Sequence, residues 1–200
     1  MTEPDVGRSK TFADAEVVLA ARDVFWSHGY EDTAVADLEG ATGLNRSSLY
    51  HSFGSKRGLF DAAVESYLDD VVRPRLAPLA EPIVAPGALE HYIRGLRRAM
   101  VDEPSSLAAN GCLLLNATGS PVGREAAVHA VVTSYVAELR AGVTAGVATR
   151  RPDLDAAASD LLTTTVTGLI FASMAIVRVD RHAAGATLDA ALAAIAPAAD

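Results

Sequence analysis

Cysteine is nearly absent from this chain, which contains one such residue in 200. The single cysteine, Cys112, excludes an intramolecular disulfide framework. Regular alternation of apolar and polar residues is also missing, so no segment has the pattern of a half-buried strand. Alanine is abundant, and 50% of the residues are hydrophobic. Together these features predict an all-α protein with enough apolar side chains to bury a core.

The sequence also lacks the usual marks of export and of membrane insertion. The N-terminus, with Glu3, Pro4 and Asp5, has neither the basic nor the apolar region of a signal peptide. The apolar and uncharged run 161–177 is interrupted by threonines and a serine. It falls short of the roughly 20 apolar residues that a membrane span needs. We therefore expect a cytoplasmic protein without a membrane partner, in which this run forms a buried or interface helix.

Residue patterns for catalysis or metal binding are sparse. There is no nucleophile–base–acid set and no glycine-rich phosphate loop. None of the histidines has a second His or a Cys at ligand spacing. They are His28, His51, His91, His129 and His182. The sequence therefore predicts no enzyme activity, no metal site and no cofactor.

The formal net charge of −8 argues against nucleic acid binding only when it is averaged over the chain. From residue 41 to residue 60 the charged residues are Arg46, Lys56 and Arg57, without an acid. Arg8 and Lys10 add positive charge near the N-terminus. Because exposed charges are screened beyond about 8 Å at physiological salt, the local sign matters more for docking than the total.

Residues 33–56 have the pattern of a helix-turn-helix. Thr33 is the expected N-cap of the first helix, whose apolar positions are Val35 and Leu38. Gly43 supplies the turn, and Asn45 is expected to cap the second helix with its side-chain oxygen. The apolar residues of the second half that are expected to point inward are Leu44, Leu49 and Phe53.

This region resembles the DNA-binding domain of TetR-family transcriptional regulators. The match extends without a gap over about forty residues, which makes it far more specific than a lone short motif. The matching positions are Phe25, Gly29, Tyr30, Thr33, Leu38, Ala41, Gly43, Leu44, Leu49, Tyr50, Phe53, Lys56, Leu59 and Phe60. Ser47 stands where relatives often carry Gly or Pro, so the operator sequence is not carried over.

The second helix of the motif is expected to carry most of the DNA contacts. Arg46 and Tyr50 are four residues apart, as are Ser47 and His51, so they form adjacent stripes on one face. Such a face, with donors and an aromatic hydroxyl, suits a major groove. The resemblance assigns phosphate contacts to Thr33, Tyr50 and Lys56. The expected DNA-binding residues are Thr33, Asn45, Arg46, Ser47, Ser48, Tyr50, His51 and Lys56.

The resemblance implies two domains, a DNA-binding helix-turn-helix domain over 1–55 and a ligand-binding and dimerisation domain over 56–200. Residues 1–10 are expected to form a mobile arm. Trp26 and Tyr30 are expected in the core of the first domain. Outside the motif, helices are expected at 11–28, from 56 to about 74 or 78, and at 87–100, 107–117, 122–149, 154–179 and 188–196, with a joint at 183–187.

The second domain is expected to enclose a site for a mostly apolar small molecule. Its candidate residues mix apolar bulk with a few polar groups, as small-molecule sites usually do. They are Tyr67, Tyr92, Met100, Cys112, Asn116, Tyr135, Phe171 and Met174. Cys112 is interpreted as a small buried thiol. The alternative is a redox or electrophile sensor, although no Lys or Arg lies near it in sequence to lower its pKa.

A stripe of small residues follows the helix expected at 154–179. It consists of Thr164, Gly168, Ala172 and Ala175. A helix that is apolar nearly all round is buried on more than one side. The resemblance implies a homodimer through 154–179 and 188–196. The most consistent function is a repressor that a small-molecule effector releases from operator DNA. The alternatives are an enzyme whose site assembles on folding and a ligand-independent DNA-binding structural protein, which a fully packed second domain would favour.

Overall fold

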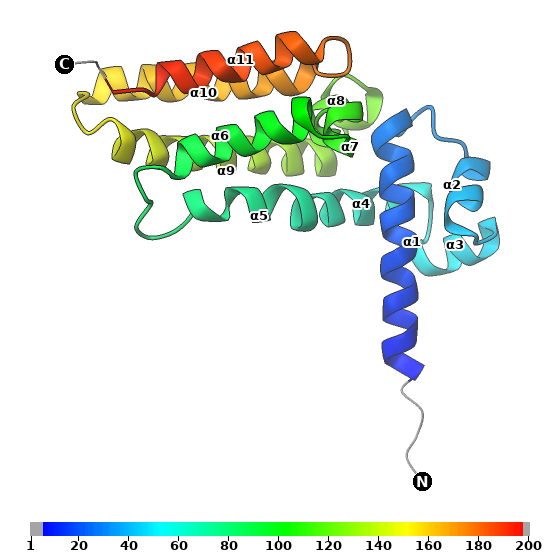
Figure 1. The fold of residues 1–200 in the computed structure, drawn as a ribbon. Coiled ribbons are helices and arrows are strands. Elements are labelled where there is room, and N and C mark those ends of the chain that lie inside the picture. Colours follow the sequence, from blue (N-terminus) through cyan, green and yellow to red (C-terminus); the bar gives the residue numbers. More distant parts are fainter. Residues whose placement is uncertain (1–5, 198–200) are drawn as a thin grey trace. The chain divides into compact units, whose positions relative to one another are not determined.

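The computed structural model describes residues 6–197, in which the regular structure is helical and contains no strand (Figure 1). The all-α prediction is therefore confirmed for this part of the chain. Contacts divide the chain into two compact units, Met1–Val71 and Val72–Asp200. They are called here the first and the second unit.

The first unit is built on helix α1 (Val6–His28), which packs against α2 (Val35–Thr42) and α4 (Lys56–Tyr67), while α3 (Arg46–Phe53) packs against α2 and α4. Aromatic rings fill its core. The Phe25 and Phe60 ring centroids lie 5.2 Å apart, edge to face, and those of Trp26 and Tyr67 lie 4.9 Å apart. Trp26 is buried and Tyr30 stacks on Phe25, so both belong to this core, as the sequence predicted.

The N-terminal boundary differs from the prediction. Helix α1 begins at Val6, five residues before the expected start at Thr11, so residues 6–10 are helical instead of forming an arm. Gly7 is the only residue of low helix propensity in this stretch, and one such glycine costs a helix about 1 kcal/mol. The side chains of Arg8 and Lys10 lie outside the described part of the chain.

The helix that starts at Lys56 continues through several kinds of turn. Tyr67 ends α4 and is followed by a π-helical segment, η1 (Leu68–Val72), then α5 (Arg73–Leu76) and a 3₁₀ segment, η2 (Ala77–Leu79). Pro74 lies at the start of α5, where a missing N–H is tolerated. Because α4 packs on α1, and Arg22 Nη1 lies 2.8 Å from Asp70 Oδ2, the first compact unit extends beyond residue 55 to Val71.

The second unit has three layers in Figure 1. Helices α10 (Ala156–Ile176) and α11 (Arg181–Ala194) lie side by side and form one layer. The middle layer contains α6 (Ala88–Arg97) and α9 (Ala126–Arg150), and α5 with η2 forms the third. Shorter segments complete the unit: η3 (Arg98–Asp102), α7 (Ser106–Asn110), α8 (Leu113–Thr118) and η4 (Pro121–Arg124).

The expected helix at 107–117 is in fact two helices, α7 and α8. Gly111 separates them with φ +67° and ψ −148°, a conformation essentially restricted to glycine. A Cβ atom at this position would lie 2.4 Å from the carbonyl oxygen of Met174. The break therefore lets the backbone pass directly against α10, a contact that residue spacing along 107–117 does not reveal.

The last helix also differs from the prediction. It begins at Arg181, where the sequence suggested a joint at 183–187 and a helix only from 188. Asp180 is its N-cap, because the carboxylate accepts a hydrogen bond of 2.9 Å from the N–H of Ala183. Gly185 lies inside the helix and allows a close approach, since a Cβ there would lie 3.1 Å from Val101 Cγ2.

Helix α10 is long and apolar enough to span a membrane when only length and composition are considered, and among the described residues it alone meets that test. In the structure it packs against α9 and α11. Even so, only 33% of its most apolar window is buried within the chain. Leu161 is 68% exposed, and Gly168, Ala172 and Ala175 are exposed as well. Helix α10 thus buries one face in its own unit and leaves a second apolar face uncovered.

Candidate functional site

Helix α3 is held in place at both of its ends. Asn45 is the N-cap, and its Oδ1 accepts a hydrogen bond of 2.9 Å from the N–H of Ser48, as the sequence predicted. Gly43 has φ +71° and forms the turn between α2 and α3, which also confirms the prediction. At the other end, the N–H of Gly54 donates to the carbonyl oxygen of Tyr50 at 2.9 Å. Leu49 is 1% exposed and anchors the inner face of α3.

The outer face of α3 carries the residues that the sequence assigned to base contacts. Arg46, Ser47 and His51 are exposed, whereas Ser48 and Tyr50 are half-buried. The guanidinium carbon of Arg46 lies 5.2 Å from the centroid of the Tyr50 ring, within the range of a cation–π contact. The face therefore presents one fixed cation, a hydroxyl and an imidazole to solvent.

Lys56 lies at the first position of α4, which is capped by Ser55. The hydroxyl oxygen of Ser55 accepts a hydrogen bond of 3.1 Å from the N–H of Gly58. The Nζ of Lys56 lies 4.5 Å from the centroid of the Tyr30 ring. This cation–π contact orients the ammonium group while leaving its donors available.

The expectation for Thr33 is wrong as far as the helix cap is concerned. The N-cap of α2 is Ala34, whose N–H donates to the carboxylate of Asp37 at 2.7 Å. Thr33 is 1% exposed, and its hydroxyl donates to the carbonyl oxygen of Gly29 at 2.6 Å. This side chain closes the turn after α1, and in this conformation it offers no hydroxyl to a phosphate.

Glu39 is a residue of this site that the sequence analysis missed. Its Oε1 accepts a hydrogen bond of 2.5 Å from the N–H of Arg46, the first residue of α3. A carboxylate at this position stabilises the positive end of the helix dipole. The acid-free segment begins only at residue 41, so the sequence alone did not associate this charge, seven residues before Arg46, with the reading face.

Part of the expected ligand site comes together in the second unit. The Sγ of Cys112 and the hydroxyl oxygen of Tyr135 lie 3.9 Å apart, and that hydroxyl donates to Met174 Sδ at 3.7 Å. The Phe171 ring lies 6.2 Å from the Tyr135 ring. Tyr92 is also buried, and its burial, together with the nearby Cys112 thiol, raises the pKa of its phenol well above the usual value. These side chains fill the core between helices.

The three remaining candidates for the ligand site are Tyr67, Met100 and Asn116. Tyr67 belongs to the first unit, where it packs against Trp26. Met100 is fully buried in η3. Asn116 lies one helical turn after Cys112, the N-cap of α8, and its N–H donates to the carbonyl oxygen of Cys112 at 3.0 Å. Its Nδ2 donates to the carbonyl oxygen of Asn110 at 2.7 Å and ties α8 to the end of α7.

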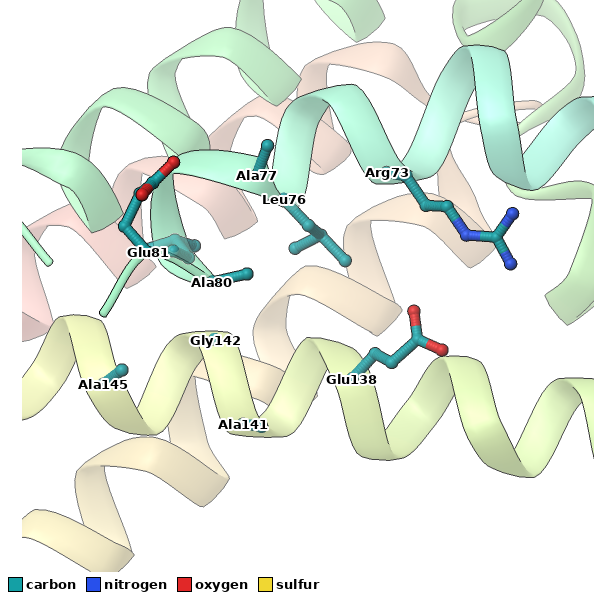
Figure 2. A pocket seen from close by; sticks show the side chains of 10 residues that line it. Arg73, Leu76, Ala77, Ala80, Glu81, Glu138, Ala141, Gly142 and Ala145 are labelled. Atoms are coloured by element: carbon teal, nitrogen blue, oxygen red, sulfur yellow. The ribbon is translucent and has the colours of Figure 1, made fainter. Parts of the chain in front are cut away.

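A groove of about 570 Å³ lies elsewhere in the second unit, between α5–η2 and α9 (Figure 2). We call it the α5–α9 groove. It is lined by Arg73, Leu76, Ala77, Leu79, Ala80, Glu81, Glu138, Ala141, Gly142 and Ala145. None of the eight expected ligand residues is among them. The expected ligand residues are mostly bulky or aromatic, whereas half of the residues that line this groove are alanine or glycine.

The comparisons of this chain with known proteins agree on one protein family. Residues 17–63 match the family described as bacterial regulatory proteins, tetR family. A transcriptional regulator of Bacillus subtilis strain 168, YezE, is 37% identical over 56% of this chain and 56% of its own length. The transcriptional repressor ComR of Escherichia coli K12 is 33% identical over 55% of this chain and 51% of its own length. The chain thus spans about half the length of these curated relatives.

A solved structure matches over nearly the whole chain. It is a cysteine mutant of the TetR family transcriptional regulator CifR, complexed with 26-base-pair double-strand operator DNA. The identity is 31% over 88% of this chain and 94% of that chain, with a TM-score of 0.68. All of these similar proteins are transcriptional regulators, and none is described as an enzyme.

Proposed function

Because the chain belongs to the TetR family of transcriptional regulators, we propose that it binds double-stranded operator DNA as a homodimer and represses transcription. A small molecule that binds the second unit would release it. The observation that carries this proposal is the outer face of α3, with Arg46, Ser47 and His51 exposed on a helix that is capped at both ends. A rigid polar helix face of this kind suits direct readout in a major groove.

Phosphate contacts position such a helix. The Lys56 ammonium and the Tyr50 hydroxyl supply the donors at this edge of the first unit. Thr33 is left out of this set because its hydroxyl is used inside the turn. Asn45 contributes by capping α3, which uses its side-chain oxygen and leaves its amide group free to donate.

The uncovered face of α10 supports a homodimer. Its small residues, Gly168, Ala172 and Ala175, allow close approach of another helix, and two-fold pairing is the commonest symmetry of soluble oligomers. We assign the interface to residues 154–179 and 188–196, since both α10 and α11 expose alanine-rich faces. A dimer places two copies of α3 on successive turns of DNA, about 34 Å or a multiple of it apart.

Release by a small molecule requires that the molecule bind more tightly to a form with low operator affinity, since a ligand without such a preference shifts nothing. The α5–α9 groove supplies room for a ligand. One observation favours the alternative of a DNA-binding protein without a ligand: six of the eight expected ligand residues are buried as core. These six are Tyr67, Tyr92, Met100, Cys112, Tyr135 and Met174.

Substitution of Arg46 and Lys56 tests the DNA-binding face. Arg46→Ala is expected to weaken binding to an identified operator by roughly 1–3 kcal/mol and to relax specificity at one position, because it removes a base contact. Lys56→Ala is expected to weaken binding to all sequences alike and to flatten the salt dependence by about one unit of slope, because it removes a phosphate contact. Gel-shift titrations over a range of salt concentrations measure both effects.

The matched control is Arg178→Ala, which removes an exposed arginine from the second unit. It is expected to leave operator binding unchanged. Thermal unfolding of Lys56→Ala is measured in parallel, since this variant also loses the contact with Tyr30. Wild-type affinity in both the Arg46 and the Lys56 variants, at every salt concentration, would show that this face does not bind DNA.

A further inference from the structure

We propose that the α5–α9 groove binds a small cationic amphiphile, with an apolar body over the groove floor and an ammonium group at Glu138. This assignment deepens the proposed ligand response and rests on it for its role in regulation. The binding event itself depends only on the second unit. Three features of the groove indicate the chemical class of the ligand: its floor, its side walls and the charged residues at its ends.

The floor of the groove is apolar and closely packed. Leu76 and Leu79 are buried, and both lie within 4 Å of a Cβ atom placed at Gly142 of α9. Figure 2 shows Leu76 directed toward α9. A Cβ atom at Gly142 would lie only 3.1 Å from Leu79 Cβ, so the two helices approach one another here because α9 has no side chain. Burial of an alkyl chain on this floor removes apolar surface from water, which favours binding.

The walls leave room above the floor because they consist mostly of alanine. Ala77 and Ala80 lie on one side, and Ala141 and Ala145 lie on the other. Larger residues at these positions would fill the space. The resulting volume of about 570 Å³ falls within the range of ordinary small-molecule sites and exceeds that of a short alkyl chain.

The charges of the groove favour a cation. Two carboxylates, Glu81 and Glu138, line it with one guanidinium, Arg73. Within the described part of the chain, Glu138 accepts one hydrogen bond, from Ser134 Oγ at 3.1 Å, and Glu81 takes part in no hydrogen bond or ion pair. Figure 2 shows the Glu138 carboxylate directed from α9 toward the α5 side of the groove. An ammonium group near it gains an ion pair, whereas a carboxylate ligand would meet two carboxylates and only one guanidinium, that of Arg73, which already takes part in another interaction.

Titration calorimetry on the 200-residue chain without DNA tests this assignment with three probes that share one alkyl chain: octylamine, octanamide and octanoate. Octylamine is expected to bind most tightly and octanoate most weakly. Glu138→Gln is expected to weaken octylamine binding about three- to fivefold, as for the loss of an exposed ion pair, and to leave octanamide binding unchanged.

A second variant tests the location of the apolar body. Ala141→Leu places a larger side chain at an exposed groove position on α9 and is expected to weaken binding of all three probes at least threefold. Its control is Ala137→Leu, one turn earlier on α9 at an exposed position that does not line the groove. Leucine is a good helix former, so both variants should fold.

Three results would overturn the assignment: octanoate binding more tightly than octylamine, octylamine affinity unchanged in Glu138→Gln, or equal effects of Ala141→Leu and Ala137→Leu. Absence of binding by every probe to the wild-type protein would also overturn it. Because DNA is absent from these titrations, none of these results bears on operator binding by α3. Conversely, failure to bind an operator would leave the groove assignment intact.

Discussion

Gly111→Ala is expected to lower the free energy of unfolding by about 3–5 kcal/mol, enough to unfold a marginally stable protein at 37 °C. Two costs combine at this position. The φ and ψ values of +67° and −148° are strained for any residue with a Cβ atom. The added methyl group would also lie 2.4 Å from the Met174 carbonyl oxygen, which is backbone and cannot rotate away. Urea unfolding followed by circular dichroism measures the loss.

The control for this experiment makes the same chemical change at a position without either cost. Gly95 lies inside α6, and a Cβ atom there would meet nothing within 4 Å. Gly95→Ala is therefore expected to stabilise the protein by about 0.5–1 kcal/mol, the helix propensity difference between the two residues. Equal unfolding midpoints for Gly111→Ala and the wild type would show that the α7–α8 break is not held in this conformation.

Gly168→Arg is expected to convert the proposed dimer into a monomer without unfolding the chain. A Cβ atom at Gly168 meets nothing within 4 Å inside the chain, so the fold itself has room for a side chain there. Arginine also has a higher helix propensity than glycine. In a helix–helix interface the same side chain would force a charge between small residues. Operator affinity should fall by roughly 10²–10⁴-fold, because two linked half-site contacts become one.

Light scattering and sedimentation over a range of concentrations measure the oligomeric state, and circular dichroism checks the fold. Ala148→Arg, on the exposed face of α9, is the matched control and should leave the oligomeric state unchanged. If Gly168→Arg has the same molar mass as the wild type at every concentration, the exposed face of α10 is not the dimer interface. A wild-type protein that is monomeric throughout would exclude the homodimer altogether.

Local chemistry explains which details of the first unit were predictable from sequence. Asn45 and Ser55 are helix caps that act within three residues, and Gly43 adopts the positive φ that its turn requires. Such features depend on neighbouring residues alone. Thr33 is not the cap because its hydroxyl is turned toward the carbonyl oxygen of Gly29, to which it donates, and α2 begins one residue later, after Ala34. Capping propensity ranks threonine above alanine, but it does not describe which way the Thr33 hydroxyl points.

Features that depend on tertiary contacts were not predictable in the same way. The break at Gly111 is set by the approach of α10, and Gly185 lies within α11 because it packs against Val101. From sequence, both glycines have the same appearance as ordinary turn or joint residues. The helix that packs against each glycine is distant along the chain, so the residue's neighbours in sequence do not reveal the contact.

The location of the ligand site was even harder to predict from sequence. Tyr135 and Met174 mix apolar bulk with polar atoms, which made them plausible site residues, yet that combination also fills a core well. The α5–α9 groove arises from the absence of side-chain volume at Gly142 and its alanine neighbours. Composition describes what a residue brings to a site, but a groove is defined by where neighbouring helices leave space.

The single thiol of this chain can serve as a natural probe of local opening in the second unit. Cys112 is 0% exposed and is the only cysteine in the sequence. It lies at the start of α8, with Tyr135 of α9 beside it. An alkylating reagent therefore reaches the sulfur only when these helices separate. Under conditions where reclosing outpaces the reaction, the alkylation rate reports the free energy of that opening, by the same logic as amide hydrogen exchange. The unmodified protein can thus record how often its own core opens, without any introduced label.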